Sequence, residues 1–255
     1  MLFLIFVVVT IALPSTTTAI PATASPLHRN NCSDWESQVD RFARTAFLFS
    51  DRPFIVPKSM TAMTVETCGQ MLAASSNLNS VVKRCLKPIP EMMAGFFSHG
   101  VRQTIRKSCS SLAAKQEYLT SMSCISDSSR YKSLADAVHV YGRQLEQVDV
   151  SVPTEQKLDV TICLYQDLRD QVRVIAARNC SRQATDYIVD TMDGSMREGM
   201  RYMDRFAHSD RKVQNEKCRP LVLQLNSLIQ WRPEVLLTQR SFIIPLIKIL
   251  SAVAN

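Results

Sequence analysis

The sequence predicts an all-α protein, a helical bundle stapled by disulfides, and three observations lead to that fold class. Apolar residues recur at helical spacing along most of the 255-residue chain. Only Val148–Pro153 alternates as a strand would, and it ends at proline, so we interpret it as a linker. Six glycines are too few for a turn-rich β-sandwich, while 46% hydrophobic and 21% charged residues indicate a folded core rather than a disordered polymer.

The N-terminal segment indicates secretion. An apolar run over residues 2–13 has the length of a signal peptide, is too short to cross a membrane and ends at Pro14. Small residues then offer cleavage after residue 19 or residue 24. A buried N-terminal helix is the alternative, but the Ser/Thr/Pro-rich stretch that follows is a poor helix former. We expect a signal peptide over residues 1–24 and a single secreted all-α domain over residues 25–255.

The helices are predicted in order along this domain. Ser33 and Glu36 form a capping box, and apolar residues at helical spacing follow over Trp35–Phe47. The clearest amphipathic pattern spans Glu91–Cys109, whose apolar stripe leaves the basic residues largely on the other face. Further helices are expected over 61–74, 78–86, 113–122, 129–147, 154–180, 183–207 and 217–229, and from residue 233 onward.

Eight cysteines predict four disulfides, because an even number in a secreted chain indicates a disulfide framework. No Cys-x-x-Cys occurs, so neither a zinc ribbon nor a thiol redox motif is indicated, and the pairing stays open. Cys163 and Cys180 would lie about 25 Å apart on one straight helix, so each must then bond a different element. The eight are Cys32, Cys68, Cys85, Cys109, Cys124, Cys163, Cys180 and Cys218.

Cysteine spacing suggests an internal duplication. Intervals of 17 and 39 residues that begin at Cys68 are echoed by intervals of 17 and 38 that begin at Cys163. The stretch 95–106 (Gly-x4-Gly-Val-Arg-x3-Arg) likewise resembles the stretch 194–205 (Gly-x4-Gly-Met-Arg-x3-Arg). Coincidence in a helical chain with spaced cysteines is the alternative. The predicted units are 60–128 and 155–222, and the cysteines without counterparts, Cys32 and Cys109, are candidates to bond each other.

No catalytic constellation is visible in the sequence. It has no Gly-x-Ser-x-Gly elbow, no phosphate-binding loop and no His-Glu-x-x-His pair. The four histidines lack an i, i+4 pairing, so His99 and His139 are interpreted as helix-surface residues rather than metal ligands. We expect a non-catalytic protein without cofactor or metal, and an enzyme whose site leaves no motif is the lesser alternative.

Two clusters suggest a partner. Basic residues predict an anion-binding patch on adjacent helices, and in a secreted protein of net charge +7 its partner would be an acidic glycan rather than nucleic acid; a solvated face is the alternative. Stripes of Met and Phe predict a packing core or a pocket for a small apolar ligand. The basic residues are Lys83, Arg84, Lys87, Arg102, Arg106 and Lys107; the apolar ones are Met92, Met93, Phe96, Phe97, Met192, Met196, Met200 and Met203.

Two further features concern modification and the C-terminus. Asn-Cys-Ser sequons at Asn31 and Asn179 are candidates for glycosylation, which competes there with disulfide formation. The Leu- and Ile-rich stretch Val235–Ala254 predicts a terminal amphipathic helix that docks on the core, with a removed lipid-anchor signal as the alternative. No membrane span is expected.

Four blocks carry a resemblance to a known family: Lys83–Pro88 (Lys-Arg-Cys-Leu-Lys-Pro), Met92–Gly100, Arg106–Cys109, and Glu117–Leu119 before Cys124. They resemble uncharacterised secreted cysteine-rich helical proteins of arthropods, which are distantly similar to the chondroitin-proteoglycan-4 type domain of nematodes. The resemblance implies secretion, disulfides and helices, without catalytic residues. Because glycosaminoglycans attach at Ser-Gly and this sequence has no such dipeptide, a proteoglycan core is not expected. The expected function is an extracellular interaction or matrix-associated role, with carriage of an apolar ligand as the alternative.

Overall fold

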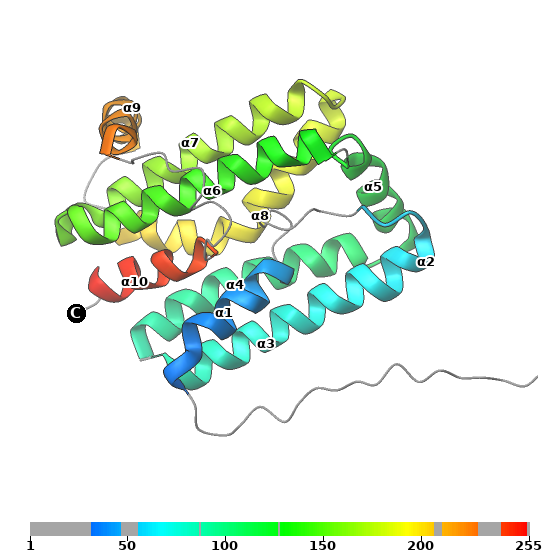
Figure 1. Ribbon diagram of the computed structural model, residues 1–255, viewed down its shortest axis with the longest axis horizontal. Helices are drawn as coiled ribbons and strands as arrows, with labels where there is room; N and C mark the ends of the chain where they lie inside the picture. Colours follow the sequence, from blue (N-terminus) through cyan, green and yellow to red (C-terminus); the bar gives the residue numbers. More distant parts are fainter. Residues whose placement is uncertain are drawn as a thin grey trace, which may run out of the picture. The chain divides into compact units, whose positions relative to one another are not determined.

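The computed structural model describes residues 32–46, 56–86, 88–126, 128–206, 211–228 and 241–253, and within these ranges it contains helices and no strand (Figure 1). The predicted all-α class is therefore confirmed. Residues from Cys32 onward form one compact unit. The predicted signal peptide lies outside the described residues, so it stays a prediction, as does a secreted domain that begins at residue 25.

The helices follow one another along the chain with short connections. A 3-10 turn (Cys32–Asp34) leads into α1, and a π-helical turn (Met63–Cys68) joins α2 to α3 without a break. A second 3-10 turn (Thr154–Gln156) precedes α7. The α-helices are α1 (Trp35–Ala46), α2 (Met60–Ala62), α3 (Gly69–Cys85), α4 (Pro88–Cys109), α5 (Leu112–Ser123), α6 (Ser128–Ser151), α7 (Lys157–Ala177), α8 (Arg182–Phe206), α9 (Arg211–Leu228) and α10 (Ile243–Val253).

Two interruptions that the sequence suggested do not exist. The predicted break between residues 74 and 78 is wrong, because α3 continues through Ser75, which is fully buried. The predicted linker Val148–Pro153 is also wrong, because α6 continues to Ser151 and buries Val148 completely. In both places burial against neighbouring helices outweighs the weak helix propensity of Ser, Asn and Val. The buried Lys157 ammonium then donates to the Asp149 carbonyl at 2.7 Å, which satisfies an acceptor in the last turn of α6.

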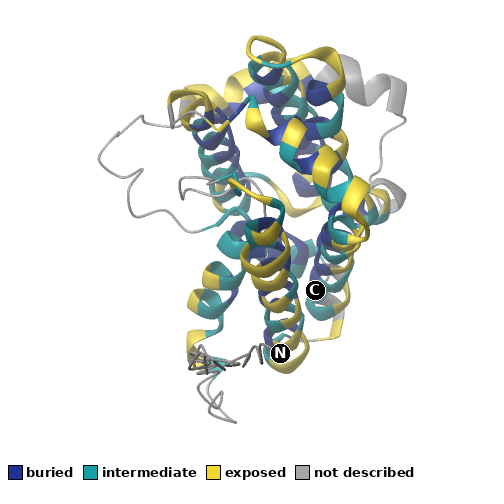
Figure 2. Ribbon diagram, turned by 90° about the vertical axis from the view of Figure 1, so that its right-hand side faces the viewer, coloured by how far each residue is buried: buried dark blue, intermediate teal, exposed yellow. Residues whose placement is uncertain are grey.

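The long helices pack as a continuous series. In space α6 lies against α7, α7 against α8, α8 against α4, α4 against α3 and α3 against α1 (Figure 1). Buried residues line the inward faces of these helices, and exposed residues lie outside (Figure 2). Because α8 packs on α7 and on α4, it connects the early and late helices of the chain.

The C-terminal helix α10 packs between the late helices α6 and α7 and the early helices α1 and α4. It contacts α1, α4, α6 and α7, and its apolar residues are buried on all sides, so it is not the amphipathic helix that the sequence predicted. The Lys248 ammonium reaches the Glu36 carboxylate on α1 at 3.0 Å. Docking of the C-terminal stretch on the core is confirmed for Ile243–Val253, and residues 235–240 lie outside the described residues.

Four disulfides join the helices, as predicted. Their Cα–Cα distances lie between 5.0 and 5.9 Å, within the range of ordinary disulfides. The suggested Cys32–Cys109 bond is wrong, because the antiparallel course of α3 and α4 brings the start of α3 to the end of α4. The inference that Cys163 and Cys180 bond different elements is confirmed. The pairs are Cys32–Cys85, Cys68–Cys109, Cys124–Cys180 and Cys163–Cys218.

The two glycine motifs of the suggested duplication lie against each other. A Cβ atom on Gly100 of α4 would come within 2.5 Å of the Ser195 carbonyl oxygen of α8, and one on Gly199 within 2.2 Å of the Phe97 ring. The disulfides do not repeat between the two suggested units. Cys163 bonds Cys218, whereas the matching residue Cys68 bonds Cys109, and Cys124–Cys180 joins the two units. The duplication stays a prediction.

Candidate functional site

A groove of about 1160 Å³ lies where α4 crosses α8, and the first turns of α5 close one of its sides. It follows α8 from Arg182 to Glu198, which spans about 24 Å at the rise of an α-helix. Hydroxyl, amide and charged side chains dominate its walls. This groove is the candidate functional site.

Two glycines allow the floor of the groove to form. A Cβ atom on Gly100 would meet backbone atoms of α8 at 2.5 Å, and one on Gly194 would meet the Thr104 hydroxyl at 2.8 Å. The two helix backbones can approach this closely only because both positions lack a side chain. The close approach leaves a hollow above the glycines, bordered by longer side chains from both helices.

Charges of both signs line the groove. Asp186 is paired with Arg173 at 3.1 Å and lies 4.0 Å from Arg182, and Glu198 is paired with Arg201 at 3.3 Å. In the part of the chain that the structure describes, four other charged residues of the groove make no ion pair. These are Lys107, Glu117, Asp190 and Arg197, all of them exposed.

The Ser108 and Tyr187 hydroxyl groups of the groove contact each other and are unactivated. Ser108 Oγ and the Tyr187 hydroxyl are 3.2 Å apart, and burial raises the pKa of Tyr187 above its ordinary value despite the opposing effect of that hydrogen bond. Tyr187 is therefore protonated at neutral pH and cannot accept a proton from Ser108. The histidine of the groove, His99, is nine residues away on α4, or about 13 Å along the helix. The groove thus holds no nucleophile–base pair among its described residues.

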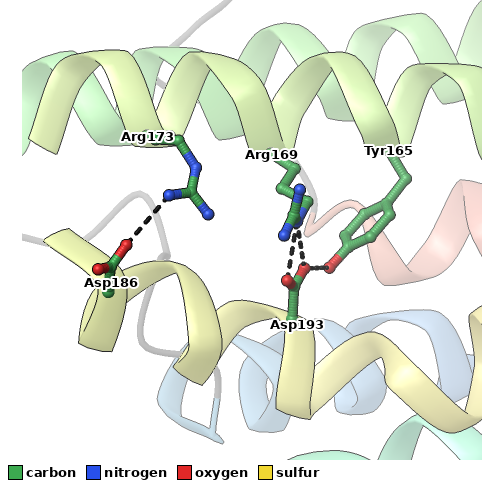
Figure 3. Close-up of polar contacts among 5 residues, drawn as sticks. All are labelled: Tyr165, Arg169, Arg173, Asp186 and Asp193. Carbon is green, nitrogen blue, oxygen red and sulfur yellow. Dashed lines mark hydrogen bonds and ion pairs between the residues drawn. The ribbon is translucent and has the colours of Figure 1, made fainter. Parts of the chain in front are cut away.

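The adjoining side of α8 is fixed to α7 by an ion-pair network (Figure 3). Arg169 Nε donates to both oxygens of Asp193 at 3.0 and 2.8 Å, and the Tyr165 hydroxyl donates to the same carboxylate at 2.8 Å. The hydrogen bond to Asp193 raises the pKa of Arg169, and burial together with the Asp193 charge raises that of Tyr165. Arg173 and Asp186, which also lines the edge of the groove, add a second link one turn of α8 from the start of the helix. The network links α8, one wall of the groove, to α7.

The basic residues that the sequence grouped are not brought together. The Cys68–Cys109 disulfide shows that α3 and α4 are antiparallel. Lys83 and Arg84 end α3 beside the start of α4, whereas Arg102 lies fourteen residues, or about 21 Å, along α4. A single anion-binding patch therefore does not form.

Each of these basic residues has its own surroundings. Arg84 donates to the Gln38 side chain at 3.3 Å, and Arg102 Nε is buried without an acceptor among the described residues. Arg106 and Lys107 are exposed, and Lys107 lines the groove. Lys87 lies outside the described residues.

The methionine and phenylalanine stripes serve mainly as packing. Met192, Met196 and Met203 are at most 6% exposed and belong to the main hydrophobic core together with Phe97. The Phe96 ring packs at 4.9 Å from the ring of Tyr202. Of the others, Met200 is half-buried against the core, Met92 is 44% exposed and the Met93 side chain lies outside the described residues.

The remaining candidates are the two sequon asparagines, the histidines and a membrane span. Asn179 is exposed in the turn between α7 and α8, whereas Asn31 lies outside the described residues. The described residues contain no group of three metal-ligating side chains, and His139 is half-buried on α6. None of the described helices has the length and apolarity that crossing a bilayer requires.

Comparisons with known proteins give no match: no family model, no curated protein and no solved structure is similar to the chain. The resemblance to secreted arthropod proteins and to the nematode domain therefore has no support beyond the sequence blocks that suggested it, and it stays a prediction.

Sequence reasoning did not find the groove. Its floor depends on the packing of two helices almost a hundred residues apart, which periodicity does not encode. The signal that pointed toward it was the pair of glycine motifs, because glycines at matching positions of two amphipathic helices favour a close crossing.

Proposed function

We propose that the chain is a secreted, non-catalytic binding protein whose ligand lies in the groove between α4, α5 and α8. The observation that carries this proposal is a large groove, lined mainly by polar residue types, in which four charged side chains of both signs have no ion-pair partner among the described residues. Such groups are stabilised when a ligand supplies the opposite charges.

The cysteines support an extracellular location. All eight form disulfides, and the described part of the chain has no free thiol. Disulfides of this number form and persist in oxidising compartments. Together with the apolar run at the N-terminus, they support secretion.

The charges define the class of ligand. The groove is lined by three cationic residues, Lys107, Arg182 and Arg197, and by four acidic residues. A polysulfated glycan would meet those carboxylates, whereas an elongated ligand with both cationic and anionic groups could pair with both sets. At about 24 Å, the groove accommodates an extended segment of about six to seven residues.

The non-catalytic assignment is supported by the protonated Tyr187 and by the distance between His99 and Ser108. A secreted enzyme whose site leaves no recognisable motif is the lesser alternative. Carriage of an apolar ligand would require the tightly packed Met and Phe side chains of the core to move apart.

Titration calorimetry of the full chain tests the proposal with two probes, a blocked hexapeptide of alternating Lys and Glu and a sulfated disaccharide. We expect the peptide to bind and the disaccharide not to bind. The charge reversals Asp190→Lys and Arg197→Glu should each weaken peptide binding. Arg219→Glu, an exposed change on α9 outside the groove, is the matched control. Binding of the disaccharide alone would favour the acidic-glycan alternative.

A further inference from the structure

Asn179 lies where a large modification can be accommodated. It is exposed in the short turn between the end of α7 and the start of α8, and it begins the sequon Asn179-Cys180-Ser181. An N-linked oligosaccharide on this turn would extend into solvent without displacing a helix.

The folded turn, however, engages both side chains that the modifying enzyme must use. The Asn179 amide nitrogen donates to the Ile175 carbonyl at 3.3 Å. The Ser181 hydroxyl accepts a hydrogen bond from the Ala184 backbone nitrogen at 3.2 Å and so caps α8. The acceptor amide and the sequon hydroxyl are therefore both occupied once α7 and α8 have formed.

The backbone of the sequon is held as well. The amide nitrogens of Asn179 and Cys180 donate to the Ala176 carbonyl at 3.0 and 2.9 Å. Cys180 is then bonded to Cys124, which links the turn to the end of α5. Modification must precede these contacts, because the folded turn cannot present an extended sequon to an enzyme.

The order in which the chain is synthesised makes disulfide closure compete with modification of Asn179. Cys124 is synthesised 56 residues before Cys180, so it is already available when the sequon emerges. The disulfide between Cys163 of α7 and Cys218 cannot close until Cys218 has emerged, 38 residues after Cys180. Closure of Cys124–Cys180 is therefore the disulfide step that competes with modification.

We infer that Asn179 is N-glycosylated in a fraction of the molecules, and that this fraction is fixed by whether glycan transfer precedes closure of the Cys124–Cys180 disulfide. The inference rests on the proposed secretion. In the transfer, the Asn179 amide nitrogen bonds to the anomeric carbon of a lipid-pyrophosphate-linked oligosaccharide. The carbon–oxygen bond to pyrophosphate breaks, the lipid pyrophosphate leaves and the amide loses one proton. A membrane-bound oligosaccharyltransferase supplies the catalyst.

The glycan would also border the groove. Asn179 precedes Arg182 by three residues, and Arg182 lines the end of the groove nearest the start of α8. A glycan here shields that end and leaves open the end near His99, so glycosylated and unglycosylated molecules differ in access to the groove.

Intact mass spectrometry of the full chain from eukaryotic cells, in medium and in cell extract, tests the inference. An Asn31→Gln background isolates Asn179. We expect two forms, of which the heavier one is converted by peptide N-glycosidase and is lost on Asn179→Gln. Cys124→Ala should shift the population toward the heavier form. Cys163→Ala removes the disulfide between α7 and Cys218 and should leave the ratio unchanged.

Two outcomes would overturn the inference. A single unmodified form in every variant, Cys124→Ala included, would show that Asn179 is not an acceptor. Equal occupancy with and without Cys124 would show that the disulfide does not compete. A second version with an unrelated secretion leader separates the two proposals, because glycosylation of that version alone would refute secretion by the native N-terminus and would uphold modification of Asn179.

Discussion

The two faces of α8 carry charged side chains of the same kinds and use them differently. Toward α7, Asp193 is bonded to Arg169 and Tyr165, and each charge has its partner (Figure 3). Toward the groove, Asp190 and Arg197 have no ion-pair partner among the described residues. Both sets of charges lie on one helix, so the difference does not come from local structure.

This difference separates a structural role from a binding role. Paired charges on the α7 face fix the position of α8, and loss of one partner leaves another group unsatisfied. Exposed charges on the groove face contribute little to folding, because water solvates them. Substitutions on the α7 face should therefore affect stability, and substitutions on the groove face should affect binding.

The largest effect is expected where a disulfide fixes the turn before α8. Replacing both Cys124 and Cys180 by Ala opens a loop of 56 residues, and the chain-entropy model gives a loss of about 4 kcal/mol in the free energy of unfolding. Urea denaturation measures the loss. Ligand affinity of the folded fraction should change much less, and a loss confined to affinity would contradict the structural role of this bond.

The next largest effect concerns the floor of the groove. Gly100→Ala places a Cβ atom 2.5 Å from a backbone oxygen of α8, and we expect a loss of about 3 kcal/mol because α4 and α8 must move apart. Gly95→Ala is the matched control on the same helix, since nothing lies within 4 Å of its Cβ position. That change should raise stability by up to about 1 kcal/mol through helix propensity. Equal effects would show that the helices do not cross closely at Gly100.

Variants of two aspartates of α8 allow a direct comparison of the two faces. Asp193→Ala leaves the half-buried Arg169 unpaired and removes the acceptor of the Tyr165 hydroxyl, so we expect a loss of about 2 kcal/mol in the free energy of unfolding. Asp190→Ala should change it by less than about 0.5 kcal/mol. Thermal and urea unfolding of both variants measure this difference, and similar losses would remove the distinction between the faces.

The smallest effect is a pH dependence at the α7 face. Burial raises the pKa of Tyr165 in the folded state above the ordinary value of about 10 for an unfolded chain. The folded state therefore retains a proton that the unfolded state releases, so this contribution to stability is present below pH 10 and is lost as the pH rises further. The slope is at most about 1.4 kcal/mol per pH unit for one group.

The tyrosines of the two faces can be compared in the same way. Unfolding free energies measured across alkaline pH should fall less steeply for Tyr165→Phe than for the parent protein. Tyr187→Phe should alter the slope less, since the hydrogen bond with Ser108 opposes the effect of burial on the pKa of Tyr187. A parent-like slope for Tyr165→Phe would show that this hydroxyl is not buried against Asp193.

The fold class could be predicted from the sequence, because helical periodicity and an even set of cysteines are local or compositional signals. The pairing of Cys32 with Cys85 could not, since it depends on how α1 packs against the α3–α4 hairpin. The helix breaks predicted near Ser75 and at Val148–Pro153 are wrong for a related reason. Helix propensity is weak there, and burial against neighbouring helices determines the conformation. The groove could not be derived, since Gly100 and Gly194 act only once their helices meet.

Native mass spectrometry of the protein secreted by eukaryotic cells tests the central claim, that the groove between α4, α5 and α8 holds the ligand. The account predicts extra mass that leaves on denaturation and is lost from the double variant with Asp190→Lys and Arg197→Glu, while the Arg219→Glu control retains it. Extra mass that persists in the double variant would contradict the account and place the ligand elsewhere, with the Met- and Phe-lined core as the first alternative.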